Sequence, residues 1–187
     1  MEFQPTLPPQ KTRGFRERDA EQNRLDHSRD TYYNIPVSPA DMSGWTAPLA
    51  VHNSVPCIQF ATGVTDLARF AKNKPELWRH GKIRTDIWWT TNGTSTGAVD
   101  LDYLLVGNEE DVTTGSGGTT LYNATISLTP NGTAYIVNKT SVESSANIED
   151  THKLISGEFE RDATADANTN GFFIFRTMLK FLPVHRQ

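Results

Sequence analysis

The stretch KIRTDIWWT, residues 82–90, decides the fold class of this 187-residue chain. Its side chains alternate as in a β-strand, in which successive residues point to opposite faces. The face that should pack in a core consists of Ile83, Thr85, Ile87 and Trp89. The opposite face should meet water, yet it carries a second tryptophan, Trp88. A large aromatic residue on that face needs a partner, which makes Trp88 a candidate contact residue.

Six further stretches have the composition of short strands, and polar turns separate most of them. One short helix is expected in residues 64–73, where Val64, Leu67, Ala68 and Ala71 recur at helical spacing. No strand–helix–strand unit is visible, so a parallel α/β sheet is not expected. The pattern predicts an all-β antiparallel sandwich or barrel. The six strands are expected in residues 54–61, 98–107, 121–128, 134–142, 153–162 and 171–182.

The first 44 residues differ from the rest, which predicts an extended, largely non-globular N-terminal arm (1–44) before a β-sandwich domain (45–187). This segment is rich in proline and charge, and it contains too few large apolar residues to repay the entropy of ordering by itself. A disordered tail and an arm that orders on a partner both fit this composition. Aromatic residues favour the arm, and the candidate anchoring residues are Phe3, Phe15, Tyr32 and Tyr33.

Composition argues against several partners. The 18 basic residues are spread among 22 acidic ones and the net charge is −4, so no basic field predicts nucleic-acid binding. No apolar run is long enough to span a bilayer, and no membrane partner is expected. The single cysteine, Cys57, permits no intramolecular disulfide and suits a small core residue in a protein that assembles in a reducing cytoplasm.

No motif predicts catalysis or a cofactor. None of the five histidines lies within four residues of another, and H-E-x-x-H and G-x-S-x-G patterns are absent. We therefore expect no catalytic residue, no enzyme activity and no cofactor. Asp100 and Asp102 share a strand face near the acidic residues 109–111, where calcium is one interpretation. A solvated face paired with Arg84 or Arg176 is favoured, so no metal site is expected.

Three predicted strands carry large apolar residues on both faces. In the last strand, Phe173, Phe175, Leu179 and Phe181 are expected to point inward. If the three strands are neighbours in one sheet, their outward residues form a second apolar patch, which soluble monomers rarely expose. A subunit interface is the favoured interpretation, and cover by another segment of the same chain is the alternative. The candidate interface residues are Trp88, Leu104, Val106, Phe172, Ile174 and Met178.

Three details of residues 75–183 carry a family resemblance. A W-x-x-G turn (Trp78 to Gly81) precedes an alternating strand that ends in Trp89 and Thr90. A penultimate strand ends in an aromatic-x-Arg-Asp-Ala run, residues 159–163, and a polar loop precedes the last strand. In these details the segment resembles the jelly-roll domain of tailed-bacteriophage virion proteins, of the tail-fibre, spike and head-decoration type. The resemblance implies a non-enzymatic, usually trimeric building block of a virion that assembles in the bacterial cytoplasm. It also implies that the arm attaches the domain to the major capsid protein or another virion protein.

Two functional hypotheses follow from this resemblance. The first is a homotrimeric capsid decoration (cement) or fibre-anchoring protein attached through its arm. The alternative is a carbohydrate-binding, receptor-recognition module of a tail fibre or spike. Sandwich domains bind sugars with exposed aromatic side chains, and Trp45, Trp78 or Trp88 could stack on a pyranose ring of a host glycan.

Overall fold

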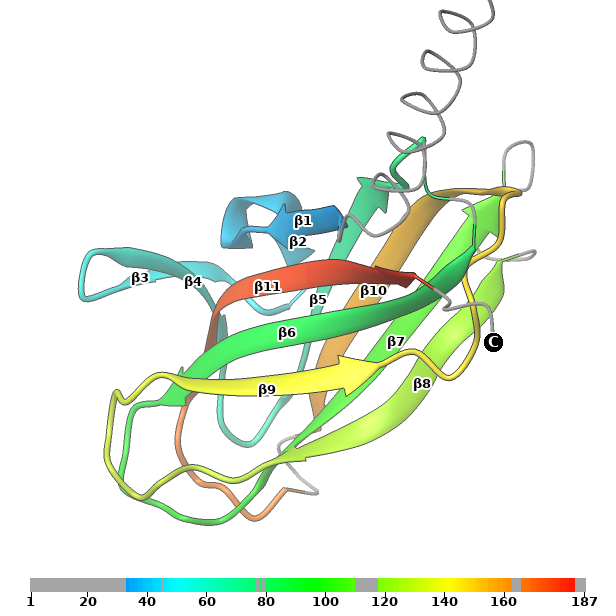
Figure 1. The fold of residues 1–187 in the computed structure, drawn as a ribbon. Helices are drawn as coiled ribbons and strands as arrows, with labels where there is room; N and C mark the ends of the chain where they lie inside the picture. The colour runs from blue at the N-terminus through cyan, green and yellow to red at the C-terminus, as the bar shows by residue number, and fades with distance from the viewer. Residues whose placement is uncertain are drawn as a thin grey trace, which may run out of the picture. The chain divides into compact units, whose positions relative to one another are not determined.

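The computed structural model of the protein describes residues 33–44, 46–76, 78, 80–109, 118–162 and 166–183 (Figure 1). These residues belong to one compact unit, Tyr32–Gln187. Within them no helix is long and apolar enough to cross a bilayer. The one helical element among these described residues is a single 3-10 turn, η1 (Pro39–Asp41). The strands are β1 (Tyr33–Val37), β2 (Met42–Gly44), β3 (Leu49–His52), β4 (Val55–Phe60), β5 (Thr65–Asn73), β6 (Gly81–Thr91), β7 (Val99–Glu109), β8 (Thr119–Leu128), β9 (Asn138–Glu143), β10 (His152–Asp162) and β11 (Phe172–Pro183).

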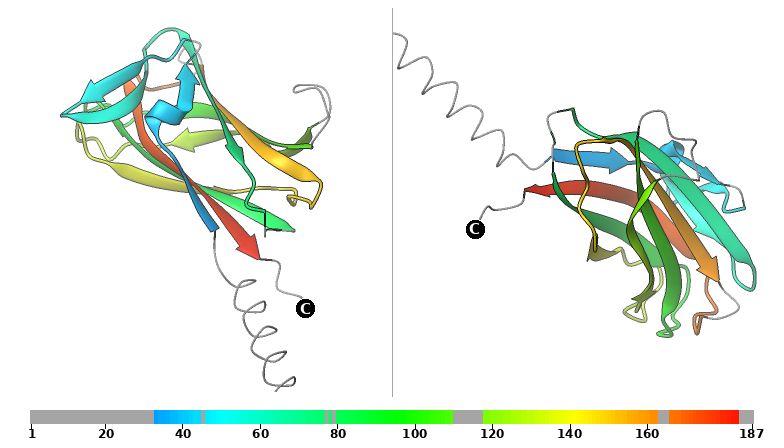
Figure 2. Two further views of the ribbon diagram at one scale, coloured as in Figure 1. Left: turned by 90° about the horizontal axis from the view of Figure 1, so that it is seen from above. Right: turned by 90° about the vertical axis from the view of Figure 1, so that its right-hand side faces the viewer.

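Two antiparallel sheets form the sandwich. Sheet I has the order β3-β4-β11-β6-β9, and β1 also pairs with β11. Sheet II has the order β2-β5-β10-β7-β8. The further views in Figure 2 show the sheets as two layers. Most neighbouring strands are not consecutive in the sequence, as in β11 beside β6 and β10 beside β7. The predicted all-β antiparallel sandwich is confirmed.

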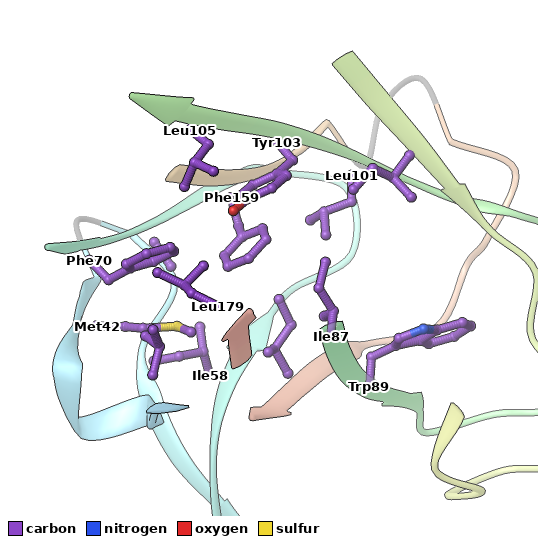
Figure 3. Packing of buried hydrophobic residues seen from close by; sticks show 14 of the residues in the cluster. Met42, Ile58, Phe70, Ile87, Trp89, Leu101, Tyr103, Leu105, Phe159 and Leu179 are labelled. Carbon is purple, nitrogen blue, oxygen red and sulfur yellow. The ribbon is translucent and has the colours of Figure 1, made fainter. Parts of the chain in front are cut away.

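The core lies between the sheets and is rich in aromatic side chains (Figure 3). Tyr103 of β7 stacks on Phe159 of β10 with ring centroids 4.7 Å apart. Its hydroxyl lies 2.9 Å from the hydroxyl of Thr85 on β6, so the polar end of the ring is satisfied inside the core. The predicted core face of residues 83–89 is confirmed, because Ile83, Thr85, Ile87 and Trp89 are all buried.

The predicted helix over residues 64–73 is wrong. The segment is β5, which pairs with β10 along its whole length and with β2 in its middle, at residues 68–70. Asp66, Ala68 and Phe70 alternate toward the interior, whereas Val64 is exposed. The segment is therefore a strand in which every second residue is buried. The helical spacing of its aliphatic residues does not correspond to a buried face.

Residues 33–44, which the sequence places in the arm, belong to both sheets. Strand β1 pairs with β11, and β2 pairs with β5. Val37 is fully buried and Met42 nearly so. Tyr33 packs edge-on against Trp78 with ring centroids 6.3 Å apart, so this candidate anchor is a residue of the sandwich. Phe3, Phe15 and Tyr32 lie outside the described residues.

The expected facing of the last strand is wrong at its start. The register of β11 on β6 shifts between Ile174 and Arg176, which leaves Phe175 as the extra residue of a β-bulge. Before the bulge, Phe172 and Ile174 face the core and are fully buried. Beyond it Leu179 and Phe181 face the core as expected. The bulge explains why even-numbered residues face the core before it and odd-numbered residues face the core after it.

Arg161 explains the aromatic-x-Arg pattern at the end of β10. Its side chain and that of Asp166 are fully buried and joined by an ion pair of 2.7 Å. The guanidinium also donates to the backbone carbonyls of Asn168, at 2.9 Å, and Asn170, at 2.8 Å. A buried charge needs such compensation. Arg161 therefore fixes the loop that leads into β11 and has a structural role.

Candidate binding surface on the outer face of sheet I

The outer face of sheet I presents three rows of side chains across β9, β6 and β11, which lie side by side in Figure 1. Because Ile83, Thr85 and Ile87 face the core, the intervening residues of β6 point outward. The strand registers define the rows, which are Glu143–Arg84–Lys180, Ser141–Asp86–Met178 and Lys139–Trp88–Arg176. The outward face of residues 82–90 is therefore a charged platform.

Asp86 is the centre of this platform. Its side chain is fully buried, and its Oδ2 lies 2.9 Å from Lys139 Nζ and 2.7 Å from Lys180 Nζ. Its Oδ1 accepts hydrogen bonds from Arg84 Nε at 3.0 Å and from Ser141 Oγ at 2.7 Å. Burial opposes ionisation, but these four donors outweigh it and hold the pKa of Asp86 well below its usual range.

Trp88 lies between two cations. Lys139 Nζ is 5.2 Å from the centroid of its ring, and the Arg176 guanidinium carbon is 5.3 Å away. The two residues come from the strands on either side of β6. The ring is half-buried and makes cation–π contacts with both. Trp88 therefore holds charged side chains in place and does not offer an open ring face.

An aromatic group lies on the same face of sheet I. His52, at the end of β3, stacks on Tyr135 with ring centroids 4.5 Å apart and an interplanar angle of 20°. The imidazole also contacts Phe173 at 5.3 Å and Phe175 at 6.2 Å. Phe173 is largely covered, whereas Tyr135 is 48% exposed. We call His52, Tyr135, Phe173 and Phe175 the aromatic group.

Tyr135 is held in an unusual backbone conformation. Its φ of +65° lies in the left-handed region, which bulky residues rarely occupy and which costs on the order of 1–3 kcal/mol. Its amide donates to the carbonyl of Thr91 at 2.8 Å, and the hydroxyl of Thr90 donates to the carbonyl of Ile136 at 2.7 Å. These two bonds to the end of β6 fix the exposed ring over the sheet. Strain that presents a side chain to solvent points to a function for that side chain.

The aromatic group and the three rows of side chains around Asp86 are connected through the chain. Phe175 of the aromatic group directly precedes Arg176, and Tyr135 lies four residues before Lys139. The aromatic group and the rows around Asp86 together form one surface that combines aromatic rings, amides and cations. Such a surface can stack on a ring-shaped ligand and donate hydrogen bonds to it. Asn53, beside His52, adds a side-chain amide.

Sheet II has a different feature, an open hollow of about 530 Å³ on its outer face. Leu104, Val106, Leu154 and Ala71 supply apolar lining, and Asp41, Arg69 and Glu158 supply charge. Phe70 also lines it, but its ring is buried and lies beneath Gly157. The hollow thus has no exposed aromatic platform.

The structure separates the six candidate interface residues. Trp88 and Met178 lie on the outer face of sheet I, and Leu104 and Val106 line the hollow on sheet II. Phe172 and Ile174 are in the core because of the bulge. A single patch formed by all three strands is therefore wrong, since β7 belongs to the other sheet. Only Trp88 and Met178 keep the predicted position on a shared outward face.

The acidic face of β7, with Asp100 and Asp102, does not have the arginine partners that the sequence predicted. Asp102 accepts a hydrogen bond from Thr125, and Asp100 accepts one from Ser127, both on β8. Arg84 and Arg176 are on sheet I and do not pair with them. Within the described part of the chain, no group of three or more His, Cys, Asp or Glu residues could hold a metal ion. Of the acidic residues 109–111, only Glu109 is described.

The tryptophans proposed to stack on sugar are not open in the structure. Trp78 is 4% exposed and contacts Phe181, and Trp88 is flanked by cations. Trp45 lies outside the described residues. Among the described residues, the aromatic ring that is well exposed is that of Tyr135, which was not among the residues predicted from the sequence. The apolar run Tyr135-Ile136-Val137 after an Asn-Gly turn was a usable pattern, because these three residues are all exposed.

No protein-family model and no curated protein sequence matches this chain. Solved structures are similar in fold. A family 35 carbohydrate binding module from Clostridium thermocellum superposes with a TM-score of 0.56 at 10% identity, over 79% of this chain and 97% of that one. The CBM35 from Cellvibrio japonicus Abf62 gives 0.53 at 10% identity, over 79% and 92%. An exo-beta-1,3-galactanase from Phanerochaete chrysosporium gives 0.51 at 8% identity, over 78% of this chain and 29% of that chain.

These similarities establish the fold alone. They confirm the jelly-roll sandwich, because two compact modules match over almost their whole length. They give no support to the phage-virion part of the resemblance. The match to the galactanase covers less than a third of that enzyme.

Proposed function

We propose that this protein is a non-catalytic carbohydrate-binding protein, and that it recognises a glycan through the aromatic group on the outer face of sheet I. Structures of the same fold that are named as carbohydrate binding modules support the proposal. The observation that carries it is Tyr135, an exposed ring that is stacked on His52 and held in a strained conformation.

The geometry of Tyr135 suits a sugar ring. One face of the phenol ring is covered by His52, so the exposed area belongs to the other face and the edge. Apolar C–H faces of a pyranose can pack on such a ring while its hydroxyls bond to nearby amides and cations. Asn53, whose Nδ2 lies 3.2 Å from His52 Nε2, is one such amide.

The proposal is tested with Tyr135→Asn. Asparagine tolerates positive φ far better than tyrosine, so the variant should fold with an unchanged or higher thermal midpoint. Its affinity for glycans that the wild-type chain selects on an array should fall about tenfold or more by calorimetry, as expected for loss of a central aromatic contact. Because stability does not fall, weaker binding cannot be attributed to unfolding.

Leu104→Asn is the matched control in the hollow on sheet II. It should leave glycan affinity unchanged if the aromatic group is the site. Loss of binding in Leu104→Asn but not in Tyr135→Asn would show that the glycan binds in the hollow on sheet II and not at the aromatic group on sheet I. A wild-type chain that binds no glycan on a broad array would overturn the function itself.

A further inference from the structure

The outer face of sheet I has a charge opposite to that of the chain. Across β6, β9 and β11 it carries five cations, Lys82, Arg84, Lys139, Arg176 and Lys180. It carries two carboxylates, Asp86 and Glu143. The chain as a whole has a net charge of −4. The positive charge on this face is therefore local, and it is concentrated around one buried aspartate.

Asp86 orients the cations without neutralising them. One carboxylate accepts from Arg84, Lys139 and Lys180, so two positive charges of this cluster stay uncompensated. The carboxylate has no exposed surface, whereas the three cations are 27–41% exposed. Since the lowered pKa keeps Asp86 ionised, the cluster keeps its geometry at physiological pH. The lysines are thus pre-oriented donors at the surface.

Arg176 adds a further donor beside this cluster. Its side chain is exposed, and it has no carboxylate partner among the described residues. The guanidinium lies over the ring of Trp88, and this cation–π contact limits its conformational freedom. A guanidinium presents paired N–H donors that match the oxygens of a carboxylate or sulfate. Trp88 therefore positions Arg176 and Lys139 for an anionic group.

We propose that the glycan bound by this protein is polyanionic, with carboxylate or sulfate groups that pair with Arg176 and Lys139 while a neighbouring sugar ring packs on Tyr135. This proposal depends on the function proposed above and adds the chemical class of the ligand. Both parts of the surface are needed, because the aromatic group recognises a sugar ring and the cations recognise its charge. Duplex DNA is also a polyanion that these cations would attract, so it is included in the test as the competing ligand.

The test uses the full chain and four polymers: a sulfated polysaccharide (heparin), a carboxylated one (polygalacturonate), neutral dextran and duplex DNA. Binding is measured by calorimetry at low and at physiological salt. We expect heparin or polygalacturonate to bind more tightly than dextran and DNA, and their affinity to fall at least severalfold with added salt. The polymer that binds tells sulfate from carboxylate. Equal affinity for dextran, or tighter binding of DNA, would overturn the polyanionic-glycan assignment.

Arg176→Met separates this proposal from the proposed function. The variant should weaken binding of the anionic polysaccharide about tenfold or more, the effect of a lost charge-assisted hydrogen bond. Lys153→Met, an exposed lysine on β10 of the other sheet, is the matched control and should have no effect. If Tyr135→Asn abolishes binding while Arg176→Met does not, the protein binds glycans but the charge assignment fails. If the wild-type chain binds no polysaccharide at all, both proposals fail.

Discussion

At the scale of single residues, His152 is a buried side chain whose protonation would break a hydrogen bond of the fold. It is almost fully buried, and its Nδ1 accepts a hydrogen bond of 2.9 Å from the amide of Glu149. Gly107 lies against the ring, where an added Cβ would approach Nδ1 to 2.8 Å. The imidazole must be neutral at Nδ1 to make this bond. Burial lowers the pKa of His152, although Glu109 and Glu149 act in the opposite direction.

The first prediction concerns pH. The folded-state pKa of His152 lies below the unfolded value of about 6.5. At a pH between these two values, the unfolded state therefore binds more protons than the folded state. Stability should therefore fall as the pH drops below about 6.5 toward the folded-state pKa. In His152→Asn the amide oxygen can accept the same hydrogen bond without titrating. Thermal unfolding between pH 7.5 and 5 should show a smaller decline for this variant, and an equal decline would remove His152 as the cause.

At the scale of elements, the bulge in β11 sets which residues are core and which are surface. Ile174 pairs with Trp89 and Arg176 pairs with Trp88, so Phe175 has no partner residue on β6. Phe175 and Arg176 thus both lie on the outer face. This places an aromatic side chain and a cation next to each other on the proposed binding surface.

The second prediction follows from the bulge. Deleting Phe175 should give a regular strand in which Ile174, Thr177 and Leu179 keep their inward facing, so the chain should fold with a modest loss of stability. Deleting Met178 should turn Leu179 and Phe181 outward, and each lost burial costs about 1.5–3 kcal/mol. Circular dichroism melts of the two deletions test this. Similar melting of both variants would mean that the bulge does not absorb the extra residue.

Periodicity predicts an element when all of its residues share one alternation, as in residues 82–90 and 99–105. It fails where two patterns overlap or where the alternation changes within a strand. In β5 the residues Leu67, Ala68 and Ala71 imitate a helix, and only the pairing with β10 and β2 decides the outcome. In β11 the bulge is invisible to a fixed period of two, which is why Phe172 and Ile174 were assigned to the surface.

The candidate site was harder to predict than the fold. Trp88 was correctly recognised as unusual, but its partners Lys139 and Arg176 come from strands far away in the sequence. Tyr135 depends on a local backbone conformation that a tertiary hydrogen bond to Thr91 maintains. Neither arrangement leaves a motif in the sequence. Pairing between distant strands creates both.

At the scale of the whole sandwich, the two outer faces carry opposite charge. On β5, β10 and β7 of sheet II, the outward charged residues are Arg69, Asp100, Asp102, Glu158 and Glu160. Sheet I instead presents the cations around Asp86. An anionic ligand is therefore attracted to one face and repelled by the other, and the negative net charge does not prevent binding.

The third prediction concerns where the folded unit begins. Every strand described here lies at or after Tyr33, so removal of residues 1–32 should leave the thermal midpoint of the sandwich unchanged. Removal of residues 1–44 also deletes β1, η1 and β2, together with the buried Val37 and Met42. Each of these two side chains contributes about 1.5–3 kcal/mol by burial, and the pairing with β11 and β5 is lost as well.

Melting curves of the full chain and the two truncated chains decide between the boundaries. We expect the shorter truncation to match the full chain, and the longer one to melt at a much lower temperature or to fail to fold, because the loss is comparable to the whole stability of a small domain. A chain that starts at residue 45 and melts like the full protein would show that β1 and β2 are accessory strands. The arm would then extend to residue 44, as the proline-rich sequence alone suggests.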